Sequence, residues 1–128
     1  MEYTFGVTVH GDFDDVVAQV TEQLSNQGFG VLSDIDVQAT LKAKLDVDRS
    51  AYRILGACNP PYANQALQAD PEIGALLPCN VIVRQDPDGV RVACMDPAAV
   101  LSLVDHPEVA ELAAEVRNRL QHVVAAVV

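Results

Sequence analysis

The chain has 128 residues, half of them apolar, which is enough for one hydrophobic core but too few for two domains of usual size. Its 18 acidic residues outnumber the 8 basic ones and give a formal net charge of -10. This charge repels a phosphate backbone and an anionic membrane, so we expect a single domain over residues 1–128 that binds neither nucleic acid nor membrane.

The first half of the chain alternates strands with helices. Apolar and polar side chains alternate from Tyr3 to Val9, as in a strand with one buried face. An apolar stripe of helical spacing follows Asp12, which is placed to cap a helix, and Gly28 is placed to end it. These patterns predict a strand at 3–9, a helix at about 13–27, a strand at 29–36, a short amphipathic helix through Val37, Leu41 and Leu45, and a strand at 51–58.

The second half begins with a helix and a hairpin. Asn59 followed by Pro60 is typical of an N-cap and a first helical turn, which predicts a helix at 62–69. Two strands, at 79–85 and 90–95, flank an Asp-Pro-Asp-Gly sequence typical of a type I turn. If Gln85 pairs with Val90, one face of the hairpin carries Cys79, Val81, Val83, Val92 and Cys94.

The chain ends in helices. Asp96 and Pro97 start a short helix through about Leu103. Asp105 and Glu108 have the spacing of a capping box, and the longest apolar stripe of the chain follows them. The sequence therefore predicts an α+β fold, a mostly antiparallel sheet of about five strands with helices on one face, the longest being C-terminal.

The acid excess has two interpretations, adaptation to high salt or an ordinary acidic cytosolic protein, and composition does not separate them. No basic segment follows Met1, and the longest apolar run, residues 123–128, is much shorter than a membrane span. The three cysteines form no Cys-x-x-Cys pair, which argues against a disulfide framework and a four-cysteine zinc site. We expect a cytoplasmic protein without a metal site.

Two Cys-Asn steps, Cys58-Asn59 and Cys79-Asn80, are the strongest candidates for chemistry. Cys58 precedes a predicted helix N-terminus, where the helix dipole can stabilise a thiolate, so Cys58 is the best nucleophile candidate. The alternative is a small buried residue followed by a capping asparagine. Asn80 lies on the opposite face of its strand from Cys79, and Cys94 is most simply a core residue.

Other polar groups have simpler explanations than a site. The histidines His10, His106 and His122 have no metal-binding spacing, and His106 and His122 suit helix ends. The acidic group around Asp12 suits capping better than calcium binding. The four cations Lys42, Lys44, Arg49 and Arg53 form either a patch for an anionic ligand or, more simply, a solvated surface.

Two motifs carry a resemblance to a known family, Leu-Gly-Ala-Cys-Asn-Pro at 55–60 and Leu-Leu-Pro-Cys-Asn at 76–80. With Lys42, Lys44 and other matching positions, the chain resembles the bacterial and archaeal domain of unknown function 302 over nearly its whole length. The resemblance implies a fold like that of the TATA-binding-protein group, with a curved antiparallel sheet that grips a long C-terminal helix, and a homodimer. It also singles out Cys58, Asn59, Pro60, Pro78, Cys79 and Asn80 as positions of one site, but it implies no activity and no cofactor.

Three functional hypotheses follow. The first is a dimeric domain that binds or senses a small ligand, with a pocket between sheet and C-terminal helix and the two Cys-Asn steps at its mouth. The second is a thiol-dependent enzyme or redox carrier in which Cys58 attacks and Cys79 resolves. The third is a structural dimerisation module whose apolar tail, residues 123–128, covers a partner.

Overall fold

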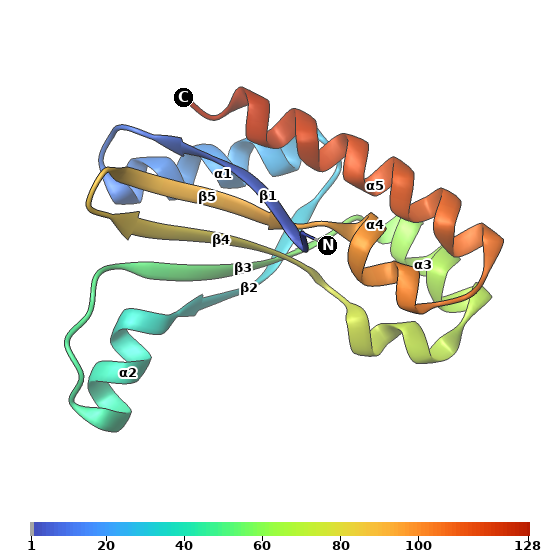
Figure 1. Cartoon of the computed structure of the whole chain (residues 1–128), viewed down its shortest axis with the longest axis horizontal. Coiled ribbons are helices and arrows are strands. Elements are labelled where there is room, and N and C mark those ends of the chain that lie inside the picture. Colours follow the sequence, from blue (N-terminus) through green and yellow to red (C-terminus); the bar gives the residue numbers. More distant parts are fainter. Residues whose placement is uncertain (1) are drawn as a thin grey trace.

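A computed structural model describes residues 2–128. The strands are β1 (Thr4–Val9), β2 (Gly30–Asp36), β3 (Tyr52–Cys58), β4 (Cys79–Asp86) and β5 (Gly89–Met95). The helices are α1 (Phe13–Asn26), α2 (Val37–Leu45), α3 (Pro60–Ala69), α4 (Pro97–Val100) and α5 (Pro107–Ala126), with short 3-10 turns η1 (Pro71–Leu76) and η2 (Leu101–Leu103). The predicted α+β class and the long C-terminal helix are confirmed (Figure 1).

The five strands form one open, curved sheet in the order β1-β5-β4-β3-β2, and every neighbouring pair is antiparallel. The predicted hairpin register is confirmed, because Gln85 pairs with Val90 and Val83 with Val92. The sheet therefore has an inner face, which the helices α1 and α5 cover, and an open face, which those helices leave uncovered (Figure 1).

Strand alternation separates the chemistry of the two faces. On β4 the residues Cys79, Val81 and Val83 point inward and are buried, whereas Asn80 points outward and is exposed. The inner face packs against buried residues of α1 and α5, among them Val20 and Leu120. This is the main core, and it confirms the prediction that Cys94 is buried among apolar neighbours.

A second, smaller core lies at one end of the molecule, under α3, η1 and the first half of α5. Its buried members are Ala66, Ile73, Leu101, Val109, Leu112 and Ala113. Tyr62 of α3 packs against both cores, so α3 lies at the boundary between them. The sequence pattern predicted one core, and the division arises because α3 and η1 pack beyond the ends of the strands (Figure 1).

Side-chain caps fix several helix starts. Asp12, Asp36 and Asp96 each accept a hydrogen bond from a backbone N–H in the first turn, at 3.2, 2.9 and 2.9 Å. Two predicted caps are wrong in detail. Asn59 is the N-cap of α3 but makes no capping hydrogen bond with its side chain, and the cap of α5 is His106, whose Nδ1 accepts from Glu108 N, rather than Asp105.

Helix α2 was predicted as amphipathic, yet none of its residues is buried. It extends from one end of the sheet, away from α3 and α5 (Figure 1), and Leu45 is 67% exposed. Lys42 pairs with Asp46 and Asp48 at 2.8 and 3.0 Å, and Arg53 pairs with Asp34. Two of the four cations of the predicted patch are therefore already neutralised within the chain.

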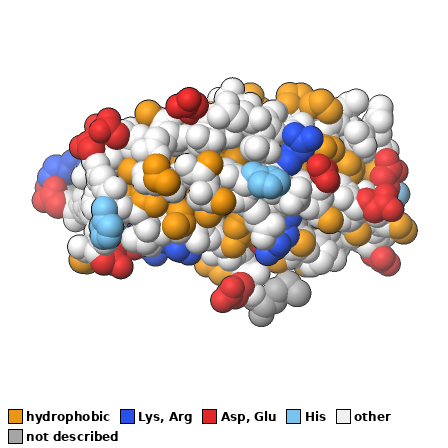
Figure 2. Space-filling view, turned by 90° about the horizontal axis from the view of Figure 1, so that it is seen from above, with side chains coloured by type: hydrophobic (Ala, Val, Ile, Leu, Met, Phe, Trp, Pro, Cys, Tyr) orange, Lys and Arg blue, Asp and Glu red, His pale blue; other side chains and the backbone are white. Residues whose placement is uncertain are grey.

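On one face of the molecule, acidic side chains lie apart from one another and form no single patch (Figure 2). In the face that Figure 2 shows, they lie mainly around the edge, with hydrophobic side chains between them. Within residues 2–128, no helix combines the length and the apolar character needed to cross a membrane.

Candidate functional site

An open apolar cavity of about 400 Å³ lies where the main core meets the second core. Its walls come from β2, the ends of β3 and β4, α3, η1, η2 and α5. It is lined by Phe29, Leu32, Ser33, Ala57, Cys58, Asn59, Tyr62, Ala63, Ala66, Leu67, Gly74, Leu77, Pro78, Cys79, Leu101, Leu112 and Val116. None of these residues carries a formal charge, so the cavity suits an uncharged, mostly apolar molecule.

Four of the six predicted site residues line this cavity, namely Cys58, Asn59, Pro78 and Cys79. The other two do not. Pro60 is exposed in the first turn of α3, and Asn80 lies on the open face of the sheet, where it lines a different hollow. The motif Pro78-Cys79-Asn80 is thus divided between the two faces of the sheet, with Pro78 and Cys79 at the cavity and Asn80 on the open face.

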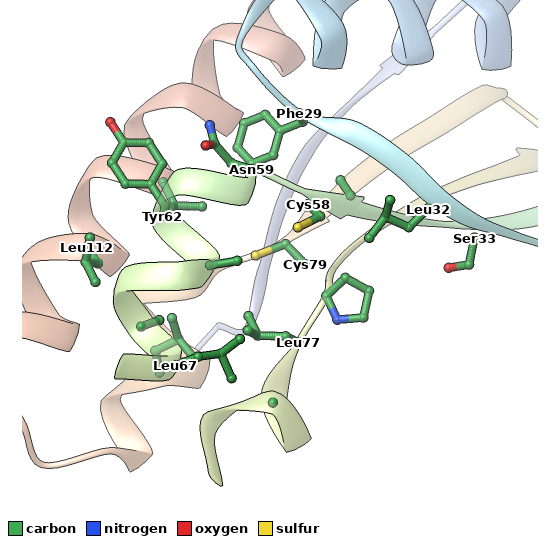
Figure 3. Close-up of a pocket in the computed structure, with 17 residues that line it drawn as sticks. Phe29, Leu32, Ser33, Cys58, Asn59, Tyr62, Leu67, Leu77, Cys79 and Leu112 are labelled. Atoms are coloured by element: carbon green, nitrogen blue, oxygen red, sulfur yellow. The ribbon is translucent and has the colours of Figure 1, made fainter. Parts of the chain in front are cut away.

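The thiols of Cys58 and Cys79 point into the same cavity (Figure 3). Antiparallel pairing places Cys79 opposite Ala57, the neighbour of Cys58. Alternation alone would turn Cys58 away from Ala57, but β3 ends at Cys58 and the chain turns there into α3. The cavity extends around this strand end, and both residues contribute to its wall.

The wall beside the thiols requires a glycine at position 56. A Cβ atom on Gly56 would lie 2.9 Å from Cγ of Pro78 and would also overlap the side chain of Ser33. Ser33 is paired with Gly56, directly after an irregularity in the β2–β3 register. Gly56 therefore allows Ser33 and Pro78 to approach each other across the strand, which closes this side of the cavity.

Burial makes two of the three thiols poor nucleophiles. It raises the pKa of Cys79 to about 11, with a smaller contribution from the neighbouring Cys58. It raises the pKa of Cys94 to about 12, again with a smaller contribution, here from Cys79. At neutral pH both groups are protonated and behave as small apolar side chains.

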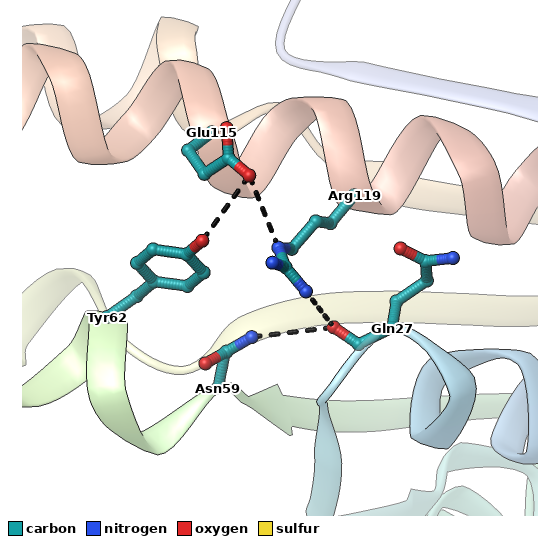
Figure 4. A network of polar contacts seen from close by, with 5 residues as sticks. All are labelled: Gln27, Asn59, Tyr62, Glu115 and Arg119. Atoms are coloured by element: carbon teal, nitrogen blue, oxygen red, sulfur yellow. Dashed lines mark hydrogen bonds and ion pairs between the residues drawn. The ribbon is translucent and has the colours of Figure 1, made fainter.

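A polar network borders the cavity on the side of α5 (Figure 4). Arg119 donates from Nη1 to the carbonyl oxygen of Gln27 at 3.1 Å and from Nε to Glu115 at 3.4 Å. The Tyr62 hydroxyl donates to the same Glu115 oxygen at 3.3 Å, and Asn59 Nδ2 donates to the Gln27 carbonyl at 3.5 Å. The Arg119 guanidinium also lies over the Tyr62 ring, 5.3 Å from the ring centroid and thus within the range of about 6 Å for a cation–π interaction.

The network connects the end of α1, the start of α3 and the middle of α5. Asn59, at 8% exposure, is the one buried polar residue of the described chain, and its Nδ2 finds its partner in this network. Its amide holds the Gln27 carbonyl in place of capping α3. Sequence reasoning missed Glu115 and Arg119, because their partners are 53 and 92 residues away along the chain and no local pattern indicates them.

The three histidines that the sequence offered as metal ligands do not form a site. His106 caps α5, and His10 and His122 are exposed. Within residues 2–128 there is no cluster of three His, Cys, Asp or Glu side chains able to hold a metal ion.

Comparison with known proteins gives a consistent result. The family model described as "Domain of unknown function DUF302" matches residues 5–127 of the chain. The chain belongs to this family. The crystal structure of an uncharacterized conserved DUF302 protein from Bacillus stearothermophilus is similar over 100% of both chains, with a TM-score of 0.93 and 26% sequence identity. A comparison with curated proteins found no match.

The resemblance seen in the sequence is therefore confirmed as membership of DUF302. The two Cys-Asn motifs of this DUF302 chain meet in space through Cys58 and Cys79 at the cavity. Neither comparison supplies an activity or a ligand, so the functional conclusion depends on the cavity itself.

Proposed function

We propose that this DUF302 protein binds a small, mostly apolar molecule in the cavity between the strand ends, α3 and α5. The observation that carries the proposal is an open cavity of about 400 Å³ with an almost wholly apolar lining. Ligand pockets are commonly about 300–1,000 Å³ in volume and combine an apolar wall with a few polar groups.

The rim of the cavity supports a ligand as well. Leu32 is 72% exposed and Leu67 is 41% exposed, and both contribute to the lining. Large aliphatic side chains left in water at the mouth of a cavity are covered when an apolar molecule binds. Of the polar side chains in the wall, Asn59 and Tyr62 already donate within the polar network, which leaves the Ser33 hydroxyl to orient a ligand by a hydrogen bond.

Filling the cavity is the direct test. Ala63 lies on α3 and lines the cavity, so Ala63→Phe places a ring in it, and Ala114→Phe on the exposed side of α5 is the matched control. Titration with the uncharged apolar dye Nile red should show saturable binding that Ala63→Phe weakens at least tenfold and Ala114→Phe leaves unchanged. Equal binding by both variants, with native circular dichroism, would refute the proposal.

A thiol-dependent enzyme or redox carrier is the second candidate, because Cys58 and Cys79 face one cavity. The high pKa of Cys79 argues against it as a resolving thiol, since the thiolate is the attacking species. Replacement of Cys58 by alanine discriminates the two candidates. Ligand binding should survive Cys58→Ala within about twofold, whereas thiol chemistry would be abolished.

We propose further that the protein is a cytoplasmic homodimer. The C-terminal tail, residues 123–128, offers a small dimer contact, because Val123 and Val127 are buried in the chain's own core and Val128 is its one large apolar side chain that is exposed. The apolar surface of β2 and α2 is the better contact, with Leu32, Ile35, Leu45 and Val47 exposed on it. Residues 34–53 balance four acidic with four basic side chains, so two acidic copies would repel least there. The free thiols fit a reducing compartment.

The dimer is tested by light scattering. Leu45→Asp should convert a dimer into a monomer, and Leu103→Asp, at another exposed leucine that lies outside β2 and α2, should leave the mass unchanged. A monomeric parent protein at high concentration would exclude the dimer.

A further inference from the structure

A second hollow, of about 440 Å³, lies on the open face of the sheet, on the other side of the strands from the apolar cavity. It is lined by Tyr3, Thr4, Tyr52, Asn80, Ile82, Arg84, Arg91, Ala93 and Met95. The lining residues of β4 and β5 alternate with the buried inner-face residues of the same strands. Unlike the apolar cavity, this hollow contains two positive charges and no negative one.

The two arginines of the hollow, Arg84 and Arg91, are directly opposite each other in the β4–β5 pair. Like charges at directly opposed positions of an antiparallel pair destabilise it. Two guanidinium groups held together in this way favour an anion between or beside them, because an oxyanion accepts hydrogen bonds from both.

The protein itself leaves the hydrogen-bonding capacity of these arginines largely unused. Nε of Arg84 is buried and has no hydrogen-bond partner among the described residues. Its Nη2 lies 3.4 Å from an oxygen of Asp86, and Arg91 has no ion pair within residues 2–128. Glu2 lies beside Arg91 in an adjoining hollow but forms no ion pair with it in the described chain.

The other six cations of the chain lie in different surroundings. Four of them form ion pairs with neighbouring carboxylates, namely Lys42, Arg53, Arg117 and Arg119. Lys44 and Arg49 have no ion pair among the described residues, but Lys44 lies on the exposed helix α2 and Arg49 stacks on the Tyr52 ring. Arg84 and Arg91 differ from all of these because they are held opposite each other in the sheet, with the 3.4 Å contact to Asp86 as their one ion pair within residues 2–128.

We propose that the open-face hollow binds the oxyanion group, carboxylate or phosphate, of a small molecule. Arg84 and Arg91 hold the anion, and the amide of Asn80 and the hydroxyl of Tyr52 are at hand in the same hollow for further hydrogen bonds. The apolar part of the molecule lies on Ile82, Ala93 and Met95, which form the rest of the floor. Arg49 stacks on the Tyr52 ring at 5.0 Å and adds positive potential at the edge.

This site does not depend on the apolar cavity. The two lie on opposite faces of the sheet, and the cavity lining includes no arginine. Asn80 belongs to the open-face hollow alone, since it points away from Cys79 and from the apolar cavity.

The test uses the full chain labelled with ¹⁵N and titrated with inorganic phosphate and, separately, with octanoate. Both probes should produce saturable changes in the side-chain N–H signals of Arg84 and Arg91, with octanoate the tighter because it also covers the apolar floor. Arg91→Gln should weaken both probes at least tenfold, and Lys44→Gln, which removes one cation from α2, should change the affinity less than twofold. Ala63→Phe should leave these signals and affinities unchanged.

Three results would overturn the proposal. The first is an affinity that Arg91→Gln leaves unaltered in a variant with native circular dichroism. The second is loss of the octanoate effect in Ala63→Phe, which would locate octanoate in the apolar cavity. The third is a change in oligomeric mass on Arg91→Gln, measured by light scattering, which would make this face a contact between copies.

Discussion

The two faces of the sheet are built from the same strands but differ completely in chemistry. The inner face is apolar and, at its end, encloses the cavity with Cys58 and Cys79. The open face carries opposed arginines, two tyrosines and Asn80 around a hollow. The difference shows that residues adjacent in a motif need not share a site, because Cys79 and Asn80 belong to opposite faces of β4.

The largest expected effect is a difference in the free energy of unfolding between truncations on the two faces of the sheet. Leu55 and Ile54 are neighbours on β3, but Leu55 is fully buried on the inner face and Ile54 is half-buried on the open face. Leu55→Ala should lower the free energy of unfolding by about 2–5 kcal/mol, through lost burial and the cavity left behind. Ile54→Ala should cost about 1 kcal/mol. Urea unfolding measures both, and equal losses would mean that the open face is covered by another part of an assembly.

The thiols test the chemistry of the inner face. At pH 7 the rate of alkylation of Cys79 should be at least about a hundredfold below that of a free thiol of pKa about 8.5, since only the thiolate reacts. The rate should rise with pH up to about 11, and Cys94 should react more slowly still. Mass spectrometry of peptides after timed alkylation gives each rate. Fast reaction of Cys79 at neutral pH would restore the redox hypothesis.

The same thiols predict the direction of a change in stability with pH. Both folded-state pKa values are raised, so the folded protein holds these protons more tightly than the unfolded chain. Their contribution to stability is complete below about pH 8.5 and is lost as the pH rises toward 11 and 12. Between pH 8.5 and 11, Cys94→Ala should therefore lose less stability than the parent protein does, as measured by urea unfolding. An equal loss would show that other groups cause the alkaline transition.

The sequence predicted most of the fold, because the alternation of β4 and β5 and the turn between them are local signals. That alternation also placed Cys79, Val81 and Val83 together and Asn80 opposite them. Part of the cavity was predictable too, since it lies between sheet and C-terminal helix. The turn of Cys58 into the cavity was not predictable, because it occurs where β3 ends and depends on how α3 packs.

The exposure of α2 was also beyond the sequence. Its apolar residues have helical spacing, and such a pattern normally indicates a buried face. Whether another element covers that face depends on tertiary packing, and within the described chain none of its residues is buried.

The next prediction concerns the polar network beside the cavity, which connects α1, α3 and α5 through the Gln27 carbonyl. Asn59 and Arg119 both donate to the Gln27 carbonyl, so either donor satisfies it when the other is removed. Asn59→Ala and Arg119→Ala should each cost about 1 kcal/mol, and the double variant should exceed their sum by about 1 kcal/mol because the carbonyl loses both donors. Urea unfolding of the four proteins completes the cycle. Strict additivity would show that the shared carbonyl is solvated and that the network does not act as a unit.

The smallest effect belongs to the ion pair at the edge strand β2. Arg53 donates to Asp34 from Nε at 2.8 Å, and this hydrogen bond holds the pKa of Asp34 below its usual value of 3.8. A lowered folded-state pKa stabilises the fold above pH 3.8 and loses its effect as the pH falls below that value. Because both side chains are partly exposed, we expect Asp34→Asn to cost less than about 1 kcal/mol at pH 7. The difference between variant and parent in urea should vanish near pH 2, and a difference that persists there would show that Asp34 acts through packing and not through its charge.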